Sequence, residues 1–214
     1  MSGASPLRGP AVRWVIAALI LVVAAAVALW PRDESGSIET RKTSQQESGV
    51  SAAERAAAGL TACPSAASGS SGSGPLAGLA VGCLADGSRT DLAAALAGKP
   101  ALVNLWAYWC APCATELPHL QEFAQRAGSA LTVVTVHSDP DEAKALARLS
   151  GLGITLPGFS DPSAAVRSAV GAPPVLPVSV LLRADGSVAS VEVRTFADVT
   201  DIADTVAAKL GITV

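Results

Sequence analysis

Two cysteines separated by two residues form the segment best suited to chemistry, Trp109-Cys110-Ala111-Pro112-Cys113. Sulfurs at this spacing can close a small disulfide ring. At the first turn of a helix, free backbone N–H groups and the positive end of the helix dipole stabilise a thiolate, which is the attacking form of cysteine. The spacing therefore predicts a redox pair in which Cys110 is the nucleophile and Cys113 the resolving residue.

The surrounding segments predict the strand-to-helix junction that such a pair needs. Residues 100–109 form a continuous apolar run typical of a buried strand, and helical spacing begins at Cys113. Further strands are expected at 131–136, 175–182 and 188–193 around a 184–187 turn, and helices after Asp139-Pro140, after Asp161-Pro162 and around 202–210. This order predicts an α/β fold with a central mixed β-sheet flanked by helices.

Two stretches carry motifs that are specific enough to suggest a family. The first is 98–113 (GKPALVNLWAYWCAPC), followed by Glu116-Leu117-Pro118, and the second is 175–180 (VLPVSV) with Asp185-Gly186. They resemble the TlpA/ResA-like branch of the thioredoxin superfamily, over roughly residues 75–214. The resemblance implies a thioredoxin-like fold and an extracytoplasmic, membrane-tethered thiol–disulfide oxidoreductase, with the WCAPC sequence as its active site.

The resemblance also implies which partners the protein has. These are cysteine-containing exported proteins, including apocytochrome c in cytochrome c maturation, and a thiol electron donor or acceptor at the membrane or outside it. No cofactor is implied beyond the redox-active Cys110–Cys113 disulfide. Some related proteins oxidise their substrates, so a disulfide-forming oxidase is the alternative. The natural substrate, redox partner and oligomeric state stay open.

Family members place a proline after a cis peptide bond against the two cysteines, and Pro177 matches that proline. A cis bond would account for a proline in a central strand. We expect Trp109, Pro112 and Leu176 to line the substrate groove. The sequence departs from the family pattern beside this groove, with Tyr108 in place of a small residue and Val178-Ser179 in place of Thr-Thr.

Glu116 is the further residue that we expect to act in the site. Asn104 stands where cytosolic thioredoxins have a buried aspartate, and an asparagine cannot shuttle a proton. Glu116 matches a functional glutamate of the ResA-like branch, so we hypothesise that it tunes the protonation of Cys113. The alternative is an ordinary first-turn glutamate favoured by the helix dipole.

Cys63 and Cys83 form the second pair of cysteines. In an oxidising compartment we expect a structural disulfide between them, closing a loop of about 20 residues and stabilising the fold by about 3 kcal/mol. The alternatives are two free thiols or a second redox relay. A zinc site built from all four cysteines is not expected, because this pair lacks CxxC spacing.

The N-terminal part of the chain predicts export. Residues 14–30 contain no charge and are bracketed by tryptophans, with two arginines before them. We expect a cytoplasmic segment at 1–10, a transmembrane signal-anchor at 11–30 and a flexible linker at 31–74, followed by the thioredoxin-like domain at 75–214. This predicts a single-pass protein of the cell membrane whose catalytic domain is extracytoplasmic. The alternative is a signal peptide cleaved after Ala28.

Composition and missing motifs exclude other classes of function. A net charge of −3 with 15% charged residues argues against a general nucleic-acid binder. His119 and His137 lack partners at metal-ligand spacing, so no metal is expected, and His137 is expected at the surface or in a cap. A peroxiredoxin-type peroxidase would need a Pro-x-x-x-Thr-x-x-Cys motif, which this sequence lacks. A copper carrier would need CxxxC and a dedicated histidine, whereas this chain has CxxC.

Overall fold

The computed structural model describes residues 14–15, 18–23, 49–66 and 72–214. The chain divides into two units, Met1–Glu47 and Ser48–Val214. In the first unit, residues 14–15 and 18–23 are helical. Among the described residues, no helix combines the length and the apolar character needed to cross a membrane. Most of the expected anchor at 11–30, and the segment 1–10, lie outside the described residues.

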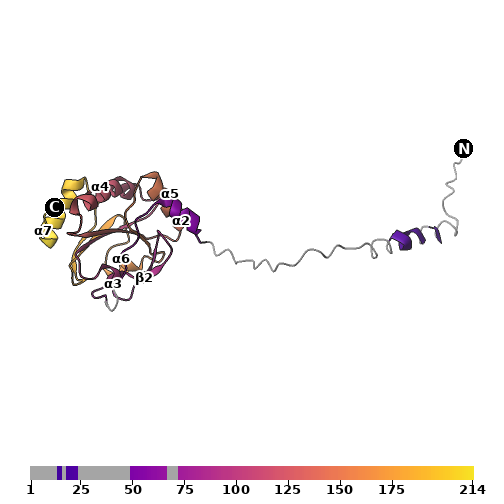
Figure 1. Cartoon of the computed structure of the whole chain (residues 1–214), viewed down its shortest axis with the longest axis horizontal. Helices are drawn as coiled ribbons and strands as arrows, with labels where there is room; N and C mark the ends of the chain where they lie inside the picture. Colours follow the sequence, from indigo (N-terminus) through magenta and orange to yellow (C-terminus); the bar gives the residue numbers. More distant parts are fainter. Residues whose placement is uncertain (1–13, 16–17, 24–48, 67–71) are drawn as a thin grey trace. The chain divides into compact units, whose positions relative to one another are not determined.

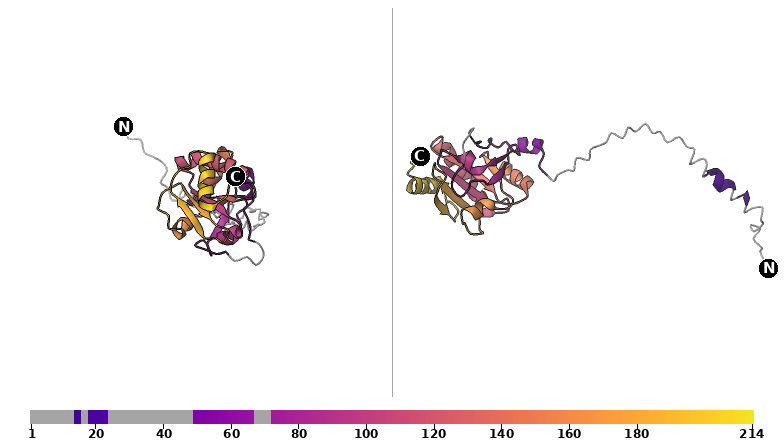
Figure 2. Two further views of the ribbon diagram at one scale, coloured as in Figure 1. Left: turned by 90° about the vertical axis from the view of Figure 1, so that its left-hand side faces the viewer. Right: turned by 90° about the horizontal axis from the view of Figure 1, so that it is seen from below.

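The second unit is built on one seven-stranded mixed sheet (Figures 1 and 2). Its strands are β1 (Ala80–Cys83), β2 (Arg89–Asp91), β3 (Ala101–Trp106), β4 (Thr132–His137), β5 (Gly158–Ser160), β6 (Val178–Leu182) and β7 (Val188–Glu192). They are ordered β2-β1-β5-β4-β3-β6-β7. Strand β3 pairs in parallel with β4 and antiparallel with β6, and all six of its residues are buried.

Helices cover both faces of this sheet (Figure 1). They are α2 (Ala52–Ala58), α3 (Leu92–Leu96), α4 (Ala111–Ala127), α5 (Glu142–Gly151), α6 (Ala165–Ala169) and α7 (Val199–Leu210). Apolar side chains of α4, α5 and α7 share one buried cluster, whereas those of α3 and α6 share the cluster on the opposite face. The predicted mixed sheet with helices on both faces is therefore confirmed.

The starts of two helices differ from the prediction. Helix α5 begins at Glu142 and is capped by Asp141, not by Asp139. The Asp139 carboxylate instead accepts hydrogen bonds from the Asp141 N–H (2.8 Å) and from the indole of Trp109 (2.9 Å). Helix α6 begins at Ala165, and the buried Asp161 accepts the first N–H groups of that helix from a position four residues earlier.

Residues 49–66 belong to the folded unit, so the prediction of a flexible linker through residue 74 is wrong for this stretch. Helix α2 starts with a capping box formed by Ser51 and Glu54 and packs against α5. Arg55 pairs with Glu142 of α5 at 2.8 Å and donates to two main-chain carbonyls, one at the end of β1 and one just after it. The prediction failed because the apolar side chains of this segment are covered only by packing against α5, a contact that no local pattern in the sequence shows. Residues 31–48 and 67–71 of the expected linker lie outside the described part.

A disulfide joins this N-terminal segment to the sheet. Cys63 is bonded to Cys83 at the end of β1, with Cα atoms 6.0 Å apart and a sequence separation of 20 residues. Cys83 is buried, and Cys63 is half-buried beside the cluster that α3 and α6 cover. The bond fastens the segment after α2 to the second strand of the sheet order.

Candidate active site

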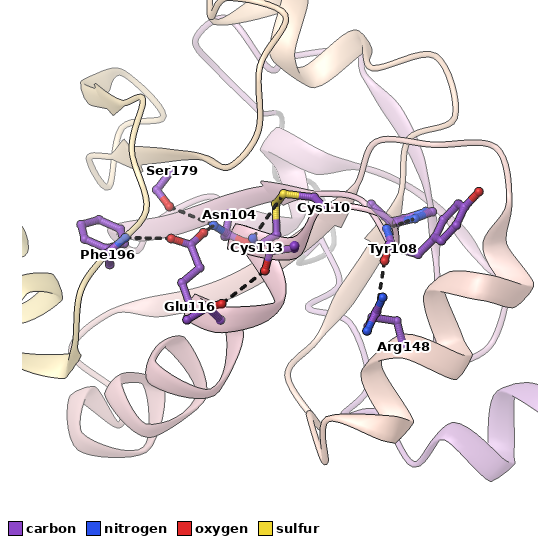
Figure 3. The surroundings of a disulfide bond; sticks show 11 residues. Asn104, Tyr108, Cys110, Cys113, Glu116, Arg148, Ser179 and Phe196 are labelled. Carbon is purple, nitrogen blue, oxygen red and sulfur yellow. Dashed lines mark hydrogen bonds between the residues drawn. A yellow bond between two sulfur atoms is a disulfide. The ribbon is translucent and has the colours of Figure 1, made fainter.

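The second disulfide, Cys110–Cys113, lies where β3 passes into α4 (Figure 3). The turn 107–110 is closed by the Cys110 N–H, which donates to the Ala107 carbonyl at 3.0 Å. Cys110 is then the N-cap of α4, and its sulfur accepts from the Cys113 N–H at 3.2 Å. The predicted nucleophile therefore sits among the free N–H groups of a helix start, where a thiolate is stabilised.

The two cysteine residues differ slightly in exposure. Cys110 keeps 5% of its surface accessible, whereas Cys113 is fully buried. Trp109, just before them, is 58% exposed, and its indole is fixed by Asp139. An incoming disulfide therefore reaches Cys110 first. This asymmetry matches the roles of attacking and resolving cysteine.

The residues expected to form the substrate groove lie on two segments. Trp109 and Pro112 are exposed at the start of α4, and the Leu176–Pro177 peptide bond is cis. Leu176 is half-buried and packs against the cluster that contains both cysteines. Pro177 is buried directly before β6.

Glu116 is completely buried one helical turn beyond Cys113. Its carboxylate accepts from the Asn104 side-chain amide at 2.6 Å and from the Phe196 N–H at 2.9 Å, as Figure 3 shows. Burial raises the pKa of Glu116 to about 7, and these two hydrogen bonds oppose the rise only in part. A carboxyl group that titrates near neutral pH is suited to exchanging protons with a neighbouring thiol.

Asn104 extends this buried network to β6. Its amide also donates to the Ser179 hydroxyl at 3.1 Å, across the antiparallel pair formed by β3 and β6. In the sequence, Ser179 stands out only as a departure from the family pattern. The available signal was a polar residue inside the apolar strand 178–182, opposite another polar residue in β3.

His137 is the site residue that the sequence analysis placed wrongly. It is buried at the end of β4 and packs against Trp106, with ring centroids 4.9 Å apart. Its Nε2 atom accepts from the Tyr108 N–H at 3.3 Å. Burial lowers the pKa of His137, opposed by nearby acids of which Asp139 is the first. The surface expectation failed because β4 is paired on both sides as far as His137, with Trp106 of β3 and Ser160 of β5, which buries the ring.

Metal-binding side chains do not gather in this part of the molecule. Within residues 14–15, 18–23, 49–66 and 72–214, no three histidine, cysteine, aspartate or glutamate side chains lie close enough together to hold an ion. All four cysteines are engaged in disulfides. The side chains of this site that can exchange electrons or protons are Cys110, Cys113 and the buried Glu116.

Comparison with known families places this site in a class. The Redoxin family model matches residues 60–208, which include both disulfides, all the elements from β1 to β7, and nearly all of α7. The chain belongs to the Redoxin family. It has a thioredoxin-like fold and is similar to ResA, DsbE and DsbF proteins. The motifs at 98–113 and 175–180 predicted the thioredoxin-like fold and the similarity to ResA.

Individual relatives are similar over shorter stretches. The chain is 26% identical over 97 residues to thiol-disulfide oxidoreductase ResA of Halalkalibacterium halodurans, covering 45% of this chain and 54% of the relative. It is 40% identical over 60 residues to thiol:disulfide interchange protein DsbE of Pseudomonas fluorescens, covering 28% and 32%. The chain thus spans about a third to a half of the length of these curated relatives. A DsbF homologue from Corynebacterium diphtheriae superposes with a TM-score of 0.53 at 26% identity, covering 61% of this chain and 83% of that structure.

Proposed function

We propose that this protein is a thiol–disulfide oxidoreductase that works through Cys110 and Cys113. The observation that carries the proposal is the placement of this pair. The sulfur of Cys110, the less buried residue of the two, caps a 17-residue helix and accepts a main-chain N–H, while Cys113 is fully buried. That placement favours the thiolate of Cys110 in the reduced protein.

In the reducing direction, the Cys110 thiolate attacks one sulfur of a substrate disulfide. A mixed disulfide forms and the other substrate sulfur leaves as a thiolate, which takes up a proton. Cys113, once deprotonated, attacks the Cys110 sulfur and releases the second substrate thiol. The substrate gains two electrons and two protons, and the protein is left with the Cys110–Cys113 disulfide that the structure contains. An external dithiol must then reduce it.

Glu116 takes part, under this proposal, as the group that exchanges a proton with Cys113. The two residues are three positions apart on α4, so their side chains are neighbours on one face of the helix. With its pKa near 7, Glu116 is partly ionised at neutral pH and can accept the proton of the resolving thiol.

The substrate side of the proposal concerns the exposed surface around Cys110. We assign the groove to Trp109 and Pro112 on one side, and to Leu176 and Pro177 on the other. The substrates proposed are exported proteins with cysteine pairs, among them apocytochromes c, and the electron donor is a thiol protein of the membrane or the extracytoplasmic space. The names of the ResA and DsbE relatives are consistent with this chemistry.

The location proposed is the outer side of the cell membrane, with residues 11–30 as the anchor in the bilayer and 1–10 in the cytoplasm. Two intramolecular disulfides support an oxidising compartment, because cytosolic proteins rarely keep them. A redox domain held near the membrane would meet both a membrane electron donor and newly exported chains.

The reduction potential of the Cys110–Cys113 pair tests this function and its direction. It should be measured on the full-length chain in detergent by equilibration with glutathione or dithiothreitol, with Cys63 and Cys83 followed separately by peptide mapping. A value near −270 mV, as in thioredoxin, supports the reductase. A value near −120 mV, as in DsbA, replaces it by a disulfide-forming oxidase. A pair that cannot be cycled rules out both.

A further inference from the structure

The turn 107–110, which places Cys110 at the helix start, is held at Tyr108 by two side chains from other elements. Tyr108 is the second residue of this turn, and both of its main-chain polar groups bind side chains of other elements. Its N–H donates to Nε2 of His137 at 3.3 Å, and its carbonyl accepts from Nε of Arg148 at 3.0 Å. Figure 3 shows Arg148 reaching the Tyr108 carbonyl beside the disulfide.

The two side chains come from consecutive parts of the structure. His137 is the last residue of β4, and Arg148 lies on α5. The connection between these elements makes two more contacts with the same region, from the Ser138 N–H to the Trp106 carbonyl at 2.8 Å and from the Trp109 indole to Asp139. The turn is therefore fastened to β4 and α5 as well as to its own strand and helix.

We propose that His137 and Arg148 are positioning residues for Cys110, acting through the main chain of Tyr108. This inference rests on the proposed function, since it assigns a role in the same redox pair. The sulfur of Cys110 is stabilised as a thiolate only while the turn holds that residue at the cap of α4, in line with the Cys113 N–H. Loosening the turn weakens that stabilisation without removing either cysteine.

The histidine makes this arrangement sensitive to acid. Because Nε2 accepts the Tyr108 N–H, the neutral ring carries its proton on Nδ1, which is buried and has no partner among the described residues. A second proton turns Nε2 into a donor that faces another donor, and the hydrogen bond is lost. Burial lowers the pKa of His137, so the accepting form prevails at neutral pH.

Several charged or titratable groups surround this position, and among them Asp139, Asp141 and Glu142 oppose the lowering of the His137 pKa by burial. The surrounding groups are Tyr108 in the turn, Asp139, Asp141, Glu142, Lys144 and Arg148 between β4 and the end of α5, and Asp161 after β5. Lys144 lies over the Tyr108 ring, 4.9 Å from its centroid. The acids favour the protonated ring, so the loss of the hydrogen bond is expected in mildly acidic solution.

The first experiment removes the arginine contact. In full-length protein purified in detergent, Arg148→Ala should shift the dithiol–disulfide equilibrium about tenfold towards the disulfide, a potential about 30 mV more negative. The alkylation profile of Cys110 should move to higher pH. Arg148→Lys, which keeps a cationic donor, should restore part of both effects. Arg167→Ala on α6 is the matched control, and it should change neither. An unchanged equilibrium and profile in a folded Arg148→Ala protein would overturn the role of Arg148.

The second experiment observes the histidine contact directly. Tyr108 is the single tyrosine of the chain, so labelling with ¹⁵N-tyrosine gives one backbone amide signal. In the wild type this signal should titrate in acid, with a midpoint below the ordinary histidine value. In His137→Gln, whose amide oxygen can accept without titrating, the midpoint should vanish. A signal that does not move in the wild type, or moves equally in the variant, would overturn the role of His137.

These readouts also separate the inference from the proposed function. Catalysed reduction of insulin disulfides by the wild type measures the proposed activity alone. If that activity is missing while the amide titration and the tenfold shift are found, the proposed function falls and the positioning roles stand. If the activity is present and both shifts are absent, the positioning roles fall alone.

Discussion

The two disulfides of this chain are chemically the same bond in two different surroundings. Cys110–Cys113 spans three residues at the start of a helix, next to the exposed Trp109. Cys63–Cys83 spans 20 residues and ties the segment after α2 to a strand. Only the first pair has a sulfur that accepts a helix N–H and a buried carboxyl group one turn away.

This difference illustrates how the surroundings of a redox-active disulfide differ from those of a structural disulfide. A cysteine at a helix start gains a stabilised thiolate, so its reduced form is populated and reactive. A cysteine in a strand, such as Cys83, gains nothing comparable, and its bond acts on the unfolded chain by closing a long loop. Under the proposed function, these surroundings give the Cys110–Cys113 pair the redox chemistry and the Cys63–Cys83 pair a stabilising role.

The largest effect is expected when cysteines are removed from one pair at a time and the activities of the two variants are compared. We predict that Cys110→Ser lowers catalysed insulin reduction at least a thousandfold, because the attacking thiolate is removed. Turnover is measured with dithiothreitol as the reductant. Cys63→Ala/Cys83→Ala serves as the matched control and should stay within about twofold of the wild type. Equal losses in both proteins would contradict the division of roles.

The same double variant should show the larger effect on stability. We predict that removing the Cys63–Cys83 bond lowers the free energy of unfolding by about 3 kcal/mol, the value expected for a closed loop of this length. Urea unfolding monitored by circular dichroism measures it. In the reference protein, Cys110→Ala/Cys113→Ala, the loss should be clearly smaller, because the loop released is only three residues.

The buried Glu116, next to the redox pair, predicts that the free energy of unfolding depends on pH; among the described residues, the Cys63–Cys83 bond has no such neighbour. The unfolded chain releases the Glu116 proton near pH 4.5, whereas the folded domain holds it until about pH 7. Stability from this group is thus complete below pH 4.5 and is lost as the pH rises through about 7. Between these values the slope is about −1.4 kcal/mol per pH unit. Glu116→Gln should remove it, as urea unfolding at pH 5, 6 and 7 can show.

A second readout connects Glu116 to the sulfurs. If the carboxyl group exchanges a proton with Cys113, Glu116→Gln should also change the pH profile of thiol alkylation in the reduced protein. An unchanged profile, together with the loss of the stability slope, would leave Glu116 as a buried structural residue.

The smallest effect is expected for Arg55, whose contacts help to hold α2 near the structural Cys63–Cys83 disulfide. Arg55 pairs with Glu142 and binds two carbonyls at the end of β1 and just after it, with little of its side chain exposed. We predict that Arg55→Ala costs about 1–2 kcal/mol of stability and leaves turnover unchanged. Lys99→Ala, an exposed lysine in a loop, is the control for loss of charge. A loss of turnover would show that α2 influences the redox pair.

The sequence predicted the elements in which local signals are strong. The apolar run before Cys110, the 184–187 turn and the helix through Val206 each carry periodicity or turn residues, and the structure contains all three. Strands β1, β2 and β5 were missed because three or four residues carry no readable period. Their existence depends on pairing with strands distant in the sequence, as β1 does with β5.

Contacts in the site between residues close in the sequence were predicted better than contacts between distant residues. Cys110, Cys113 and Glu116 are linked by helix spacing, which sequence analysis can follow. The contacts of Glu116 with Phe196 and of His137 with Tyr108 join residues 80 and 29 positions apart. No local pattern in the sequence specifies these contacts. They form only when α7 packs against α4 and when β3 and β4 pair in register.

The pairing of the four cysteines also bears on how the chain matures. The first cysteine bonds to the second and the third to the fourth, so the two loops do not overlap. Of the three pairings that four cysteines allow, only this one has that property. A polypeptide that emerges N-terminus first presents Cys63 and Cys83 before the other two have appeared. Each sulfur therefore meets its correct partner first, and the chain can be oxidised in the order of its emergence without later reshuffling.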